Sequence, residues 1–414
     1  MFSPRKIFVP KDWNHQDTLW VFSLFGTAVG AGILFLPINA GMSGFWPLIL
    51  MLIPIWKMTY LAHRGLARLV LSSKKGNENI TEVVKEHFGP YGGEIMTLLY
   101  FLAIYPIVLI YGVGVTNTAE FFLTKQLALS APPRIWLSLA LILSMMLVLW
   151  GGEKIMLRVT EFLVYPLVFF LLFISVYLIP YWNLSLLSQK PCFSDCLKTL
   201  WITIPVLIFS FNHSPLISSF TQSQVKSYED QAEKKISQIL NRTATMLLGF
   251  VMLFVFSCVL SLQPQDLIQA KELNITILSY LSSKFNTNVL AYLGSPIAFL
   301  AILSSFFGHY LGAKEGLIGL LDGYGNKKIN QKKREKAVTC FLVLSLWLTA
   351  TLNPSILGMI ETLSGPIIAI VLFVMPMYAA NKVPSMRKYK GQLGNTFVVV
   401  VGLIALSSLI YKIF

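Results

Sequence analysis

The sequence predicts an all-α integral membrane protein with eleven transmembrane helices. Of its 414 residues, 55% are hydrophobic and only 13% are charged, and the mean hydropathy is +0.66. This composition is too apolar for a soluble domain. Eleven runs each supply the roughly 20 apolar residues that a bilayer core of about 30 Å requires. Because no long linker or low-complexity tract separates these runs, residues 1–414 are expected to form a single membrane domain.

The expected spans follow one another with short polar connections. They lie near residues 18–40, 45–71, 92–123, 134–150, 156–180, 198–220, 243–262, 289–320, 337–352, 356–379 and 396–413. Basic residues precede the first run, as in a signal peptide, but the run is too long and lacks a cleavage site, so we expect it to remain as the first helix. Two connections, 77–89 and 273–285, are long enough to form helices on the surface.

The basic residues are distributed unevenly between the two sides of these spans. With the N-terminus placed in the cytoplasm, 25 of the 33 Lys and Arg residues fall on the inner side and seven on the outer side, while Lys57 falls within a span. Because positive residues concentrate on the cytoplasmic side, we expect a cytoplasmic N-terminus and a periplasmic C-terminus. Anionic lipid rather than nucleic acid then explains the net charge of +14. Lys57 is expected to extend inward or to face a water-filled vestibule.

The four cysteines predict no metal site. Cys258 and Cys340 fall within spans and are interpreted as small core residues. Cys192 and Cys196 fall in an outer loop, where they form either a disulfide or two free thiols. Two thiols without further ligands leave the coordination of a metal incomplete.

The first and sixth spans are interrupted at matching places. The sequence "GTAVGAG" places Gly26, Gly30 and Gly32 in the middle of the first span, and "SFNHSP" interrupts the sixth at 210–215. Both spans open with "TLW". Paired interruptions in two halves of five spans are typical of an inverted repeat, here about 15–180 and 198–380, with an additional helix at 396–413.

An interrupted membrane helix exposes backbone groups that a ligand can use. Carbonyls are freed at the end of the first half-helix and amides at the start of the second, so one site holds a cation and an anion, as in an amino acid zwitterion. The amides expected to bind the carboxylate lie at 27–32, among them those of Thr27, Ala28, Gly30, Ala31 and Gly32, and Gly26 is a further expected substrate-binding residue. The carbonyls expected to bind the ammonium are those of Ser210, Phe211 and Asn212. The alternative for Gly26 and Gly30 is close helix packing.

Side chains of other spans are candidates for completing the site. Tyr111, in the third span, can cap a bound substrate. His213, at the second interruption, titrates near neutral pH and is a candidate for carrying a proton, with a neutral hydrogen-bonding histidine as the alternative. Ser304 and Ser305, in the eighth span, are candidate Na⁺ ligands, and His309 is a further proton candidate. Small residues at every fourth position from 304 to 316 also favour helix packing.

The sequence resembles the serine/threonine permeases of the hydroxy and aromatic amino acid permease family, within the amino acid, polyamine and organocation transporter superfamily. The stretches that carry the resemblance are "GTAVGAGILFLPINAG" (26–41), "AHRGLARLVLS" (62–72), "ITEVVKEHFG" (80–89), "LLYFLAIYPIVLIYGVGVTNT" (98–118), "FSFNHSPLISSF" (209–220) and "LNPSILGMIETLSGPIIA" (352–369). The sequence departs from the family at Lys57 and in the Cys192–Cys196 loop.

The resemblance implies a bacterial inner-membrane symporter with a leucine-transporter-like fold. It implies import of L-serine or L-threonine driven by protons, with substrate contacts from spans one, three, six and eight, and no cofactor. The order of preference between serine and threonine, proton versus sodium coupling, and the oligomeric state stay open.

Two other functions remain as alternatives. One is an aromatic amino acid permease of the same family, and the other is an amino acid sensor that binds without transporting. An ATP-driven pump is disfavoured because the sequence lacks "GxxxxGK[ST]". An enzyme is disfavoured because five scattered histidines and acids near span ends form no catalytic or metal-binding motif.

Overall fold

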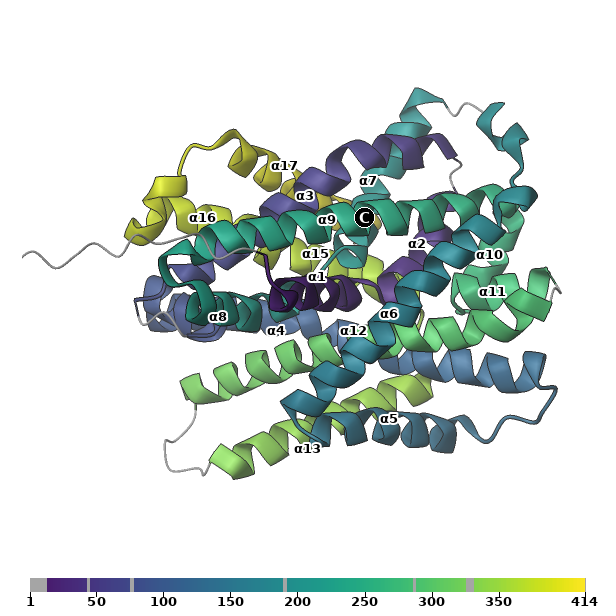
Figure 1. Ribbon diagram of the computed structural model, residues 1–414, viewed down its shortest axis with the longest axis horizontal. Helices are drawn as coiled ribbons and strands as arrows, with labels where there is room; N and C mark the ends of the chain where they lie inside the picture. The colour runs from purple at the N-terminus through teal and green to yellow at the C-terminus, as the bar shows by residue number, and fades with distance from the viewer. Residues whose placement is uncertain are drawn as a thin grey trace, which may run out of the picture.

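The computed structural model describes residues 13–42, 45–74, 78–188, 192–285, 288–324 and 331–413. These residues form a bundle of helices that run roughly side by side (Figure 1), and the described part contains no β-strand. Seven helices are long and apolar enough to cross a membrane, or eight when α1 and α2 are taken as one bent span. The expected count of eleven stays a prediction, because α5 and α17 are shorter apolar helices.

The α-helices are α1 (His15–Ala28), α2 (Ala31–Gly41), α3 (Phe45–Leu71), α4 (Ile80–Phe121), α5 (Arg134–Trp150), α6 (Glu153–Tyr177), α7 (Phe193–Ser210), α8 (Ile217–Tyr228), α9 (Ala232–Ser261), α10 (Pro264–Glu272), α11 (Ile277–Lys284), α12 (Asn288–Tyr324), α13 (Gln331–Leu352), α14 (Ile356–Met359), α15 (Gly365–Ile368), α16 (Met375–Lys382) and α17 (Leu393–Ile413). The short 3₁₀ or π segments are η1 (Phe122–Gln126), η2 (Ile179–Tyr181), η3 (Leu184–Ser188), η4 (Ser214–Leu216), η5 (Glu229–Gln231), η6 (Ile360–Ser364), η7 (Ala369–Val374) and η8 (Pro384–Tyr389).

Both expected interruptions are present. The axes of α1 and α2 differ by 52° across Val29 and Gly30, and α7 is separated from α8 by 211–213 and the 3₁₀ turn η4. In each case the residues of the break are buried. The broken segments therefore lie inside the bundle, where their backbone groups must be satisfied by protein or by a ligand.

Several expected helix bounds were too short at the same end of the bundle. α9 begins at Ala232 rather than near 243, and α8 continues to Tyr228. The added turns of α9 are polar on one face only: Ile236, Ile239 and Leu240 are buried on the other. Hydropathy alone does not detect such a stretch, because the amphipathic turns extend beyond the apolar core of the helix.

Helices are present in both connections that were expected to form surface helices, within the described residues, although most of the second helix is buried. Residue 77 lies outside the described part, and α4 begins after Asn79, whose side chain accepts hydrogen bonds from the amides of Thr81 and Glu82. Gly89, at φ +74°, then turns the chain into the long section of α4, a backbone conformation that favours glycine. The second surface helix is α11; α10, just before it, was not expected.

A buried carboxylate near the start of α10 joins this helix to α11. Asp266 accepts hydrogen bonds from the Tyr280 hydroxyl at 2.8 Å and from Lys284 Nζ at 2.9 Å. Burial opposes the charged form, but the bonds from Lys284, the Gln263 amide and Tyr280 outweigh it and hold the pKa of Asp266 below its ordinary 3.8.

We expect Asp266→Asn to lower the free energy of unfolding by about 1 kcal/mol near pH 7. Because the pKa is lower in the folded state, the stabilisation is complete above pH 3.8 and is lost as the pH falls through the folded-state value. Thermal unfolding of both proteins between pH 3 and pH 7 measures this effect. A difference in Tm that persists unchanged at pH 3 would contradict it.

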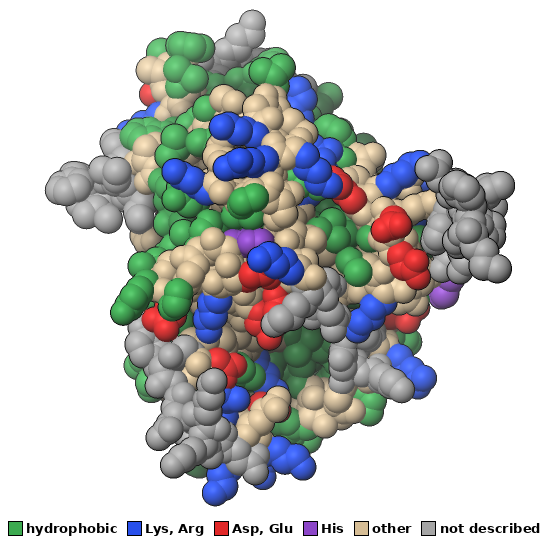
Figure 2. All heavy atoms as spheres, turned by 90° about the vertical axis from the view of Figure 1, so that its left-hand side faces the viewer, with side chains coloured by type: hydrophobic (Ala, Val, Ile, Leu, Met, Phe, Trp, Pro, Cys, Tyr) green, Lys and Arg blue, Asp and Glu red, His purple; other side chains and the backbone are tan. Residues whose placement is uncertain are grey.

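The two ends of the bundle differ in charge. We call the end that carries α8, η5, η8 and the start of α13 the inner end, and the end that carries α10 and α11 the outer end (Figure 1). Lys and Arg side chains gather on the inner end (Figure 2), among them the exposed Lys226, Lys234, Lys332, Lys333, Lys382, Arg387 and Lys388. The basic residues 5, 6, 11, 75, 190, 327 and 328 of the charge count lie outside the described part.

Lys57 lies near the inner end of the apolar segments. Its neighbour Trp56 donates a hydrogen bond to Thr245 at 3.1 Å, and Thr245 lies just inside the expected apolar start of α9. α3 has 27 residues and is roughly 40 Å long, so part of it extends beyond the hydrocarbon core. The exposed Lys57 can therefore reach the inner interface.

The cysteines carry free thiols. Cys192 is exposed and Cys196 is buried, so the disulfide alternative is absent from the structure. Cys258 is buried as expected. The expectation for Cys340 was wrong: it is exposed, because α13 is a peripheral helix that buries only one face, through Val338, Leu342 and Leu346.

Candidate functional site

The two interruptions lie against each other. A Cβ atom on Gly32 would stand 2.6 Å from the Ser210 Cα and 2.8 Å from the Phe209 ring. Only glycine permits this approach of the start of α2 to the end of α7. The first amides of α2, those of Ala31 and Gly32, have no acceptor in a preceding turn. The structure therefore places the positive end of one half-helix beside the negative end of another.

The first interruption is held by a chain of hydrogen bonds from α4 and α12. The Ser305 hydroxyl donates to the Thr27 carbonyl at 2.5 Å and lies 2.5 Å from the Tyr111 hydroxyl. Because a serine has one hydroxyl hydrogen, Tyr111 must donate to Ser305. A Cβ on Gly30 would lie 2.5 Å from Ser305 Oγ and 2.8 Å from Tyr111 Oη. Tyr111 and Ser305 thus border the break, as expected, with Gly30 directly against them.

The remaining residues of α12 are engaged differently. Ser304 donates to the Ala301 carbonyl of its own helix at 3.1 Å, whereas Ser305 bonds across to the Thr27 carbonyl of α1. His309 contacts the Ser305 carbonyl through Nδ1 at 2.9 Å, and its ring meets the edge of the Tyr111 ring. The small-residue stripe packs closely, because a Cβ on Gly308 would lie 2.9 Å from the Thr27 hydroxyl and one on Gly312 would lie 2.8 Å from Pro215.

Gly26 lies inside α1 rather than at the break. A Cβ there would stand 2.3 Å from a methyl group of Val164 on α6. This contact favours the packing alternative for Gly26, whereas Gly30 and Gly32 border the interruption. Thr27 and Ala28 form the last turn of α1, and Thr27 donates to the Ser23 carbonyl at 2.9 Å.

The second interruption is organised by a pair of histidines. The rings of His213 and His63 stack with centroids 3.5 Å apart and an interplanar angle of 8°. His63 Nδ1 lies 2.7 Å from the Thr59 carbonyl, which can only accept, so Nδ1 carries the hydrogen. His63 Nε2 then accepts the backbone N–H of His213 at 3.1 Å. His63 was not among the expected site residues, although it lies in the stretch "AHRGLARLVLS" that carries the family resemblance.

Three buried side-chain atoms at this break have no hydrogen-bond partner among the described residues. They are Ser210 Oγ, Asn212 Nδ2 and His213 Nε2, on residues that are at most 1% exposed. His213 Nδ1 lies 3.2 Å from the Phe211 carbonyl, which leaves the Nε2 lone pair open. The Phe211 carbonyl is therefore engaged, and Asn212 Oδ1 accepts the Ser214 amide at 3.1 Å. Buried polar atoms without partners are rare and require an explanation, such as a ligand.

A buried ion pair that was not expected from the sequence lies at the inner end. Asp17, 0% exposed, accepts hydrogen bonds from Lys235 Nζ at 3.1 Å and from the Tyr228 hydroxyl at 2.7 Å. These groups join the start of α1 to the end of α8 and the start of α9. The signal was obscured because Asp17 precedes the apolar run and Lys235 lies in the amphipathic turns before the expected span.

We expect Lys235→Ala to lower the free energy of unfolding by about 3 kcal/mol, because it leaves the Asp17 carboxylate buried without a cation. Thermal unfolding of the purified protein in detergent measures this loss. The matched control is Lys388→Ala, which removes the exposed pair with Glu233 and is expected to cost less than about 1 kcal/mol. Equal losses in the two variants would contradict a special role of the buried pair.

The outer end contains a polar vestibule of about 410 Å³. It is lined by Asn39 of α2 and by Met42, which follows that helix, by Lys198 and Thr199 of α7, by Lys271 of α10 and by Glu361 of η6, among others. The Asn39 amide donates to the Glu361 carboxylate. The vestibule thus lies at the outer ends of the two half-helices that meet at the breaks. No group of three or more His, Cys, Asp or Glu side chains positioned for a metal occurs in the part of the chain that the structure describes.

The model of the tryptophan/tyrosine permease family matches residues 18–412. The chain belongs to this family. Two relatives are similar over nearly their whole length. The serine transporter SdaC of Escherichia coli K12 is 53% identical over 412 residues, covering 97% of this chain and 96% of that protein. The threonine/serine transporter TdcC of Yersinia enterocolitica is 43% identical over 428 residues, covering 97% of each.

Solved structures of transporters share the fold of this permease. The protein MhsT in complex with L-phenylalanine has a TM-score of 0.59 at 12% identity, covering 98% of this chain and 99% of that chain. The manganese transporter of Eremococcus coleocola has a TM-score of 0.56 at 18% identity, covering 99% of this chain and 90% of that chain. At such low identity the likeness concerns the fold alone, which is leucine-transporter-like. The protein is a multi-pass membrane transporter and not an enzyme.

Proposed function

We propose that this permease is a proton-coupled symporter that imports L-serine, L-threonine or both across the bacterial inner membrane by alternating access. The observation that carries the proposal is the meeting of two broken helices at Gly32 and Ser210. The names of the relatives, a serine transporter at 53% identity and a threonine/serine transporter at 43% identity, support the substrate class.

The substrate's charged groups are assigned to the ends of the half-helices. The free amides of Ala31 and Gly32 at the start of α2 bind the carboxylate, as helix N-termini bind anions. The carbonyls that end α7 bind the ammonium. The buried hydroxyl of Ser210, which has no partner among the described residues, is assigned to the substrate hydroxyl.

The dimensions of the site favour a small substrate. Gly30 lies directly against Tyr111 and Ser305, and Gly32 lies directly against the ring of Phe209. A site bordered this closely has little room for an indole or phenol ring. This observation favours a hydroxy amino acid over the aromatic amino acids of the family's description.

The proton is assigned to Nε2 of His213. That nitrogen is buried and open, whereas protonation of His63 Nε2 would break its bond to the His213 amide. Two stacked imidazoles 3.5 Å apart repel each other when both are charged, so the pair takes up one proton at a time. Because the rings lie beside Ser210, protonation and substrate binding occur within the same break.

The wider organisation belongs to the same proposal. Eleven spans in two inverted repeats and an additional helix place the N-terminus in the cytoplasm and the C-terminus in the periplasm, in agreement with the basic inner end (Figure 2). The proposal needs no cofactor besides the coupling ion. The outer vestibule provides the route of entry, and the Asp17–Lys235 pair closes the inner side until the substrate is bound.

The experiment is uptake of labelled L-serine into liposomes that contain the purified protein, with a proton gradient and a sodium gradient imposed separately. Accumulation driven by the proton gradient, with competition by unlabelled L-threonine, is expected. Accumulation driven only by sodium would overturn proton coupling. Saturable serine binding without accumulation under either gradient would overturn symport and favour the sensor alternative.

A further inference from the structure

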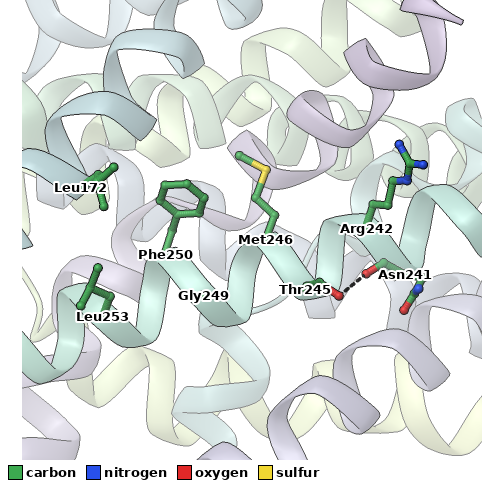
Figure 3. A pocket seen from close by; sticks show the side chains of 8 residues that line it. All are labelled: Leu172, Asn241, Arg242, Thr245, Met246, Gly249, Phe250 and Leu253. Atoms are coloured by element: carbon green, nitrogen blue, oxygen red, sulfur yellow. Dashed lines mark hydrogen bonds between the residues drawn. The ribbon is translucent and has the colours of Figure 1, made fainter. Parts of the chain in front are cut away.

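A groove of about 500 Å³ runs along the exposed face of α9. None of its lining residues belongs to either helix break. Met246, Phe250 and Leu253 of α9 and Leu172 of α6 form its apolar walls (Figure 3). Its floor is Gly249, where an added Cβ would meet no atom within 4 Å. The absence of a side chain at this position therefore leaves open space that helix packing does not use.

One end of the groove is polar and lies at the inner interface. Asn241, Arg242 and Thr245 line this end, at the boundary where the apolar section of α9 begins. Trp56 donates to Thr245 at 3.1 Å, and aromatic side chains of this kind are typical of the headgroup region. The groove thus runs from the headgroup level into the hydrocarbon region.

The side chain of Arg242 places a positive charge at this polar end of the groove. Its guanidinium stacks over the Trp13 ring at 3.7 Å, and the side chain is exposed. Among the described residues no carboxylate forms a salt bridge with it. A fixed cation at the mouth of an apolar groove is complementary to one class of molecule, a lipid with an anionic headgroup and an acyl chain.

We propose that this groove binds one anionic phospholipid of the inner leaflet. The phosphate pairs with Arg242, and one acyl chain lies over Gly249 between Phe250 and Leu172. The site contacts the broken helix: Phe250 packs edge-on against Phe25 of α1 with ring centroids 6.1 Å apart, and Trp13 immediately precedes α1. A bound lipid therefore lies against the half-helix that carries the first interruption.

The test is native mass spectrometry of the purified full-length protein in detergent, titrated with dioleoyl phosphatidylglycerol or dioleoyl phosphatidylcholine. The expected result is retention of one phosphatidylglycerol, with phosphatidylcholine retained more weakly. Arg242→Gln is expected to weaken retention of phosphatidylglycerol roughly fivefold, the effect of one basic residue near a membrane surface. Arg242→Lys keeps the positive charge and is expected to weaken retention of phosphatidylglycerol by a smaller factor.

A second variant tests the acyl-chain section. Gly249→Leu places a side chain in the groove, where its Cβ would meet no atom within 4 Å, and raises helix propensity. The protein is therefore expected to fold and yet retain phosphatidylglycerol at least fivefold more weakly. Matched controls are Arg387→Gln, an exposed arginine of η8, and Ser144→Leu, an exposed small residue of α5. Both controls are expected to retain the lipid as the unchanged protein does.

Equal retention of phosphatidylglycerol by all variants, or equal retention of the two lipids by the unchanged protein, would overturn the proposal. A second readout is the rise in Tm that a ligand of the folded state produces. Phosphatidylglycerol is expected to raise the Tm of the unchanged protein but not of Arg242→Gln. Neither measurement involves substrate, so its outcome is independent of the proposed transport function.

Discussion

Gly30→Leu is expected to abolish serine uptake while the protein still reaches the membrane. The first side-chain carbon would stand 2.5 Å from Ser305 Oγ and 2.8 Å from the Tyr111 hydroxyl. It would therefore displace the hydrogen-bond chain that holds the Thr27 carbonyl, and a leucine side chain would fill the space beside the break. Initial uptake rates into proteoliposomes, with protein amount measured by immunoblot, check this prediction.

Two alanine variants accompany this test: Gly30→Ala is a smaller change at the same position, and Gly114→Ala is the control. Gly30→Ala is expected to reduce uptake at least tenfold, because even a single methyl group meets the same atoms. Gly114→Ala on α4, whose added Cβ would make only ordinary contact with Ile302 at 3.4 Å, is expected to keep nearly full uptake. Normal uptake by Gly30→Leu would remove the first interruption from the substrate site.

His213→Gln is expected to abolish proton-driven accumulation of serine and to flatten the pH dependence of uptake. The variant loses the open Nε2 lone pair but keeps a polar side chain beside the break. Exchange of external for internal serine does not need a net proton movement, so it is expected to persist. The measurement compares accumulation under a proton gradient with counterflow in the same liposomes, between pH 5.5 and 8.

Two further variants separate a proton carrier from a structural histidine. His63→Gln removes the stacked ring and the acceptor for the His213 amide, and we expect it to shift the pH profile rather than to abolish coupling. His87→Gln, in the section of α4 before Gly89, removes a histidine that bonds Ser72 and is expected to leave the profile unchanged. An unchanged pH profile in His213→Gln would return this residue to a structural role.

Much of the fold could be predicted because a bilayer imposes a simple rule on the sequence. Long apolar runs must be helices, and the two runs broken by "GTAVGAG" and "SFNHSP" are the two broken helices of the structure. Errors occurred where the chain leaves the hydrocarbon. The inner turns of α9 and the short helix α10 are amphipathic. Their polar faces lower the mean hydropathy of these segments, so a search for apolar runs does not find them.

The sequence by itself determined the membrane class, the positions of both interruptions and the glycines on which the close approach depends. These features are local, because a glycine or a proline changes the backbone where it stands. Only the tertiary structure decided which groups meet. The stack of His63 on His213, the ion pair of Asp17 with Lys235 and the packing of Gly26 against Val164 each join residues 138 or more positions apart. Such contacts depend on how helices pack in three dimensions, and the spacing of residues along one chain carries no record of it.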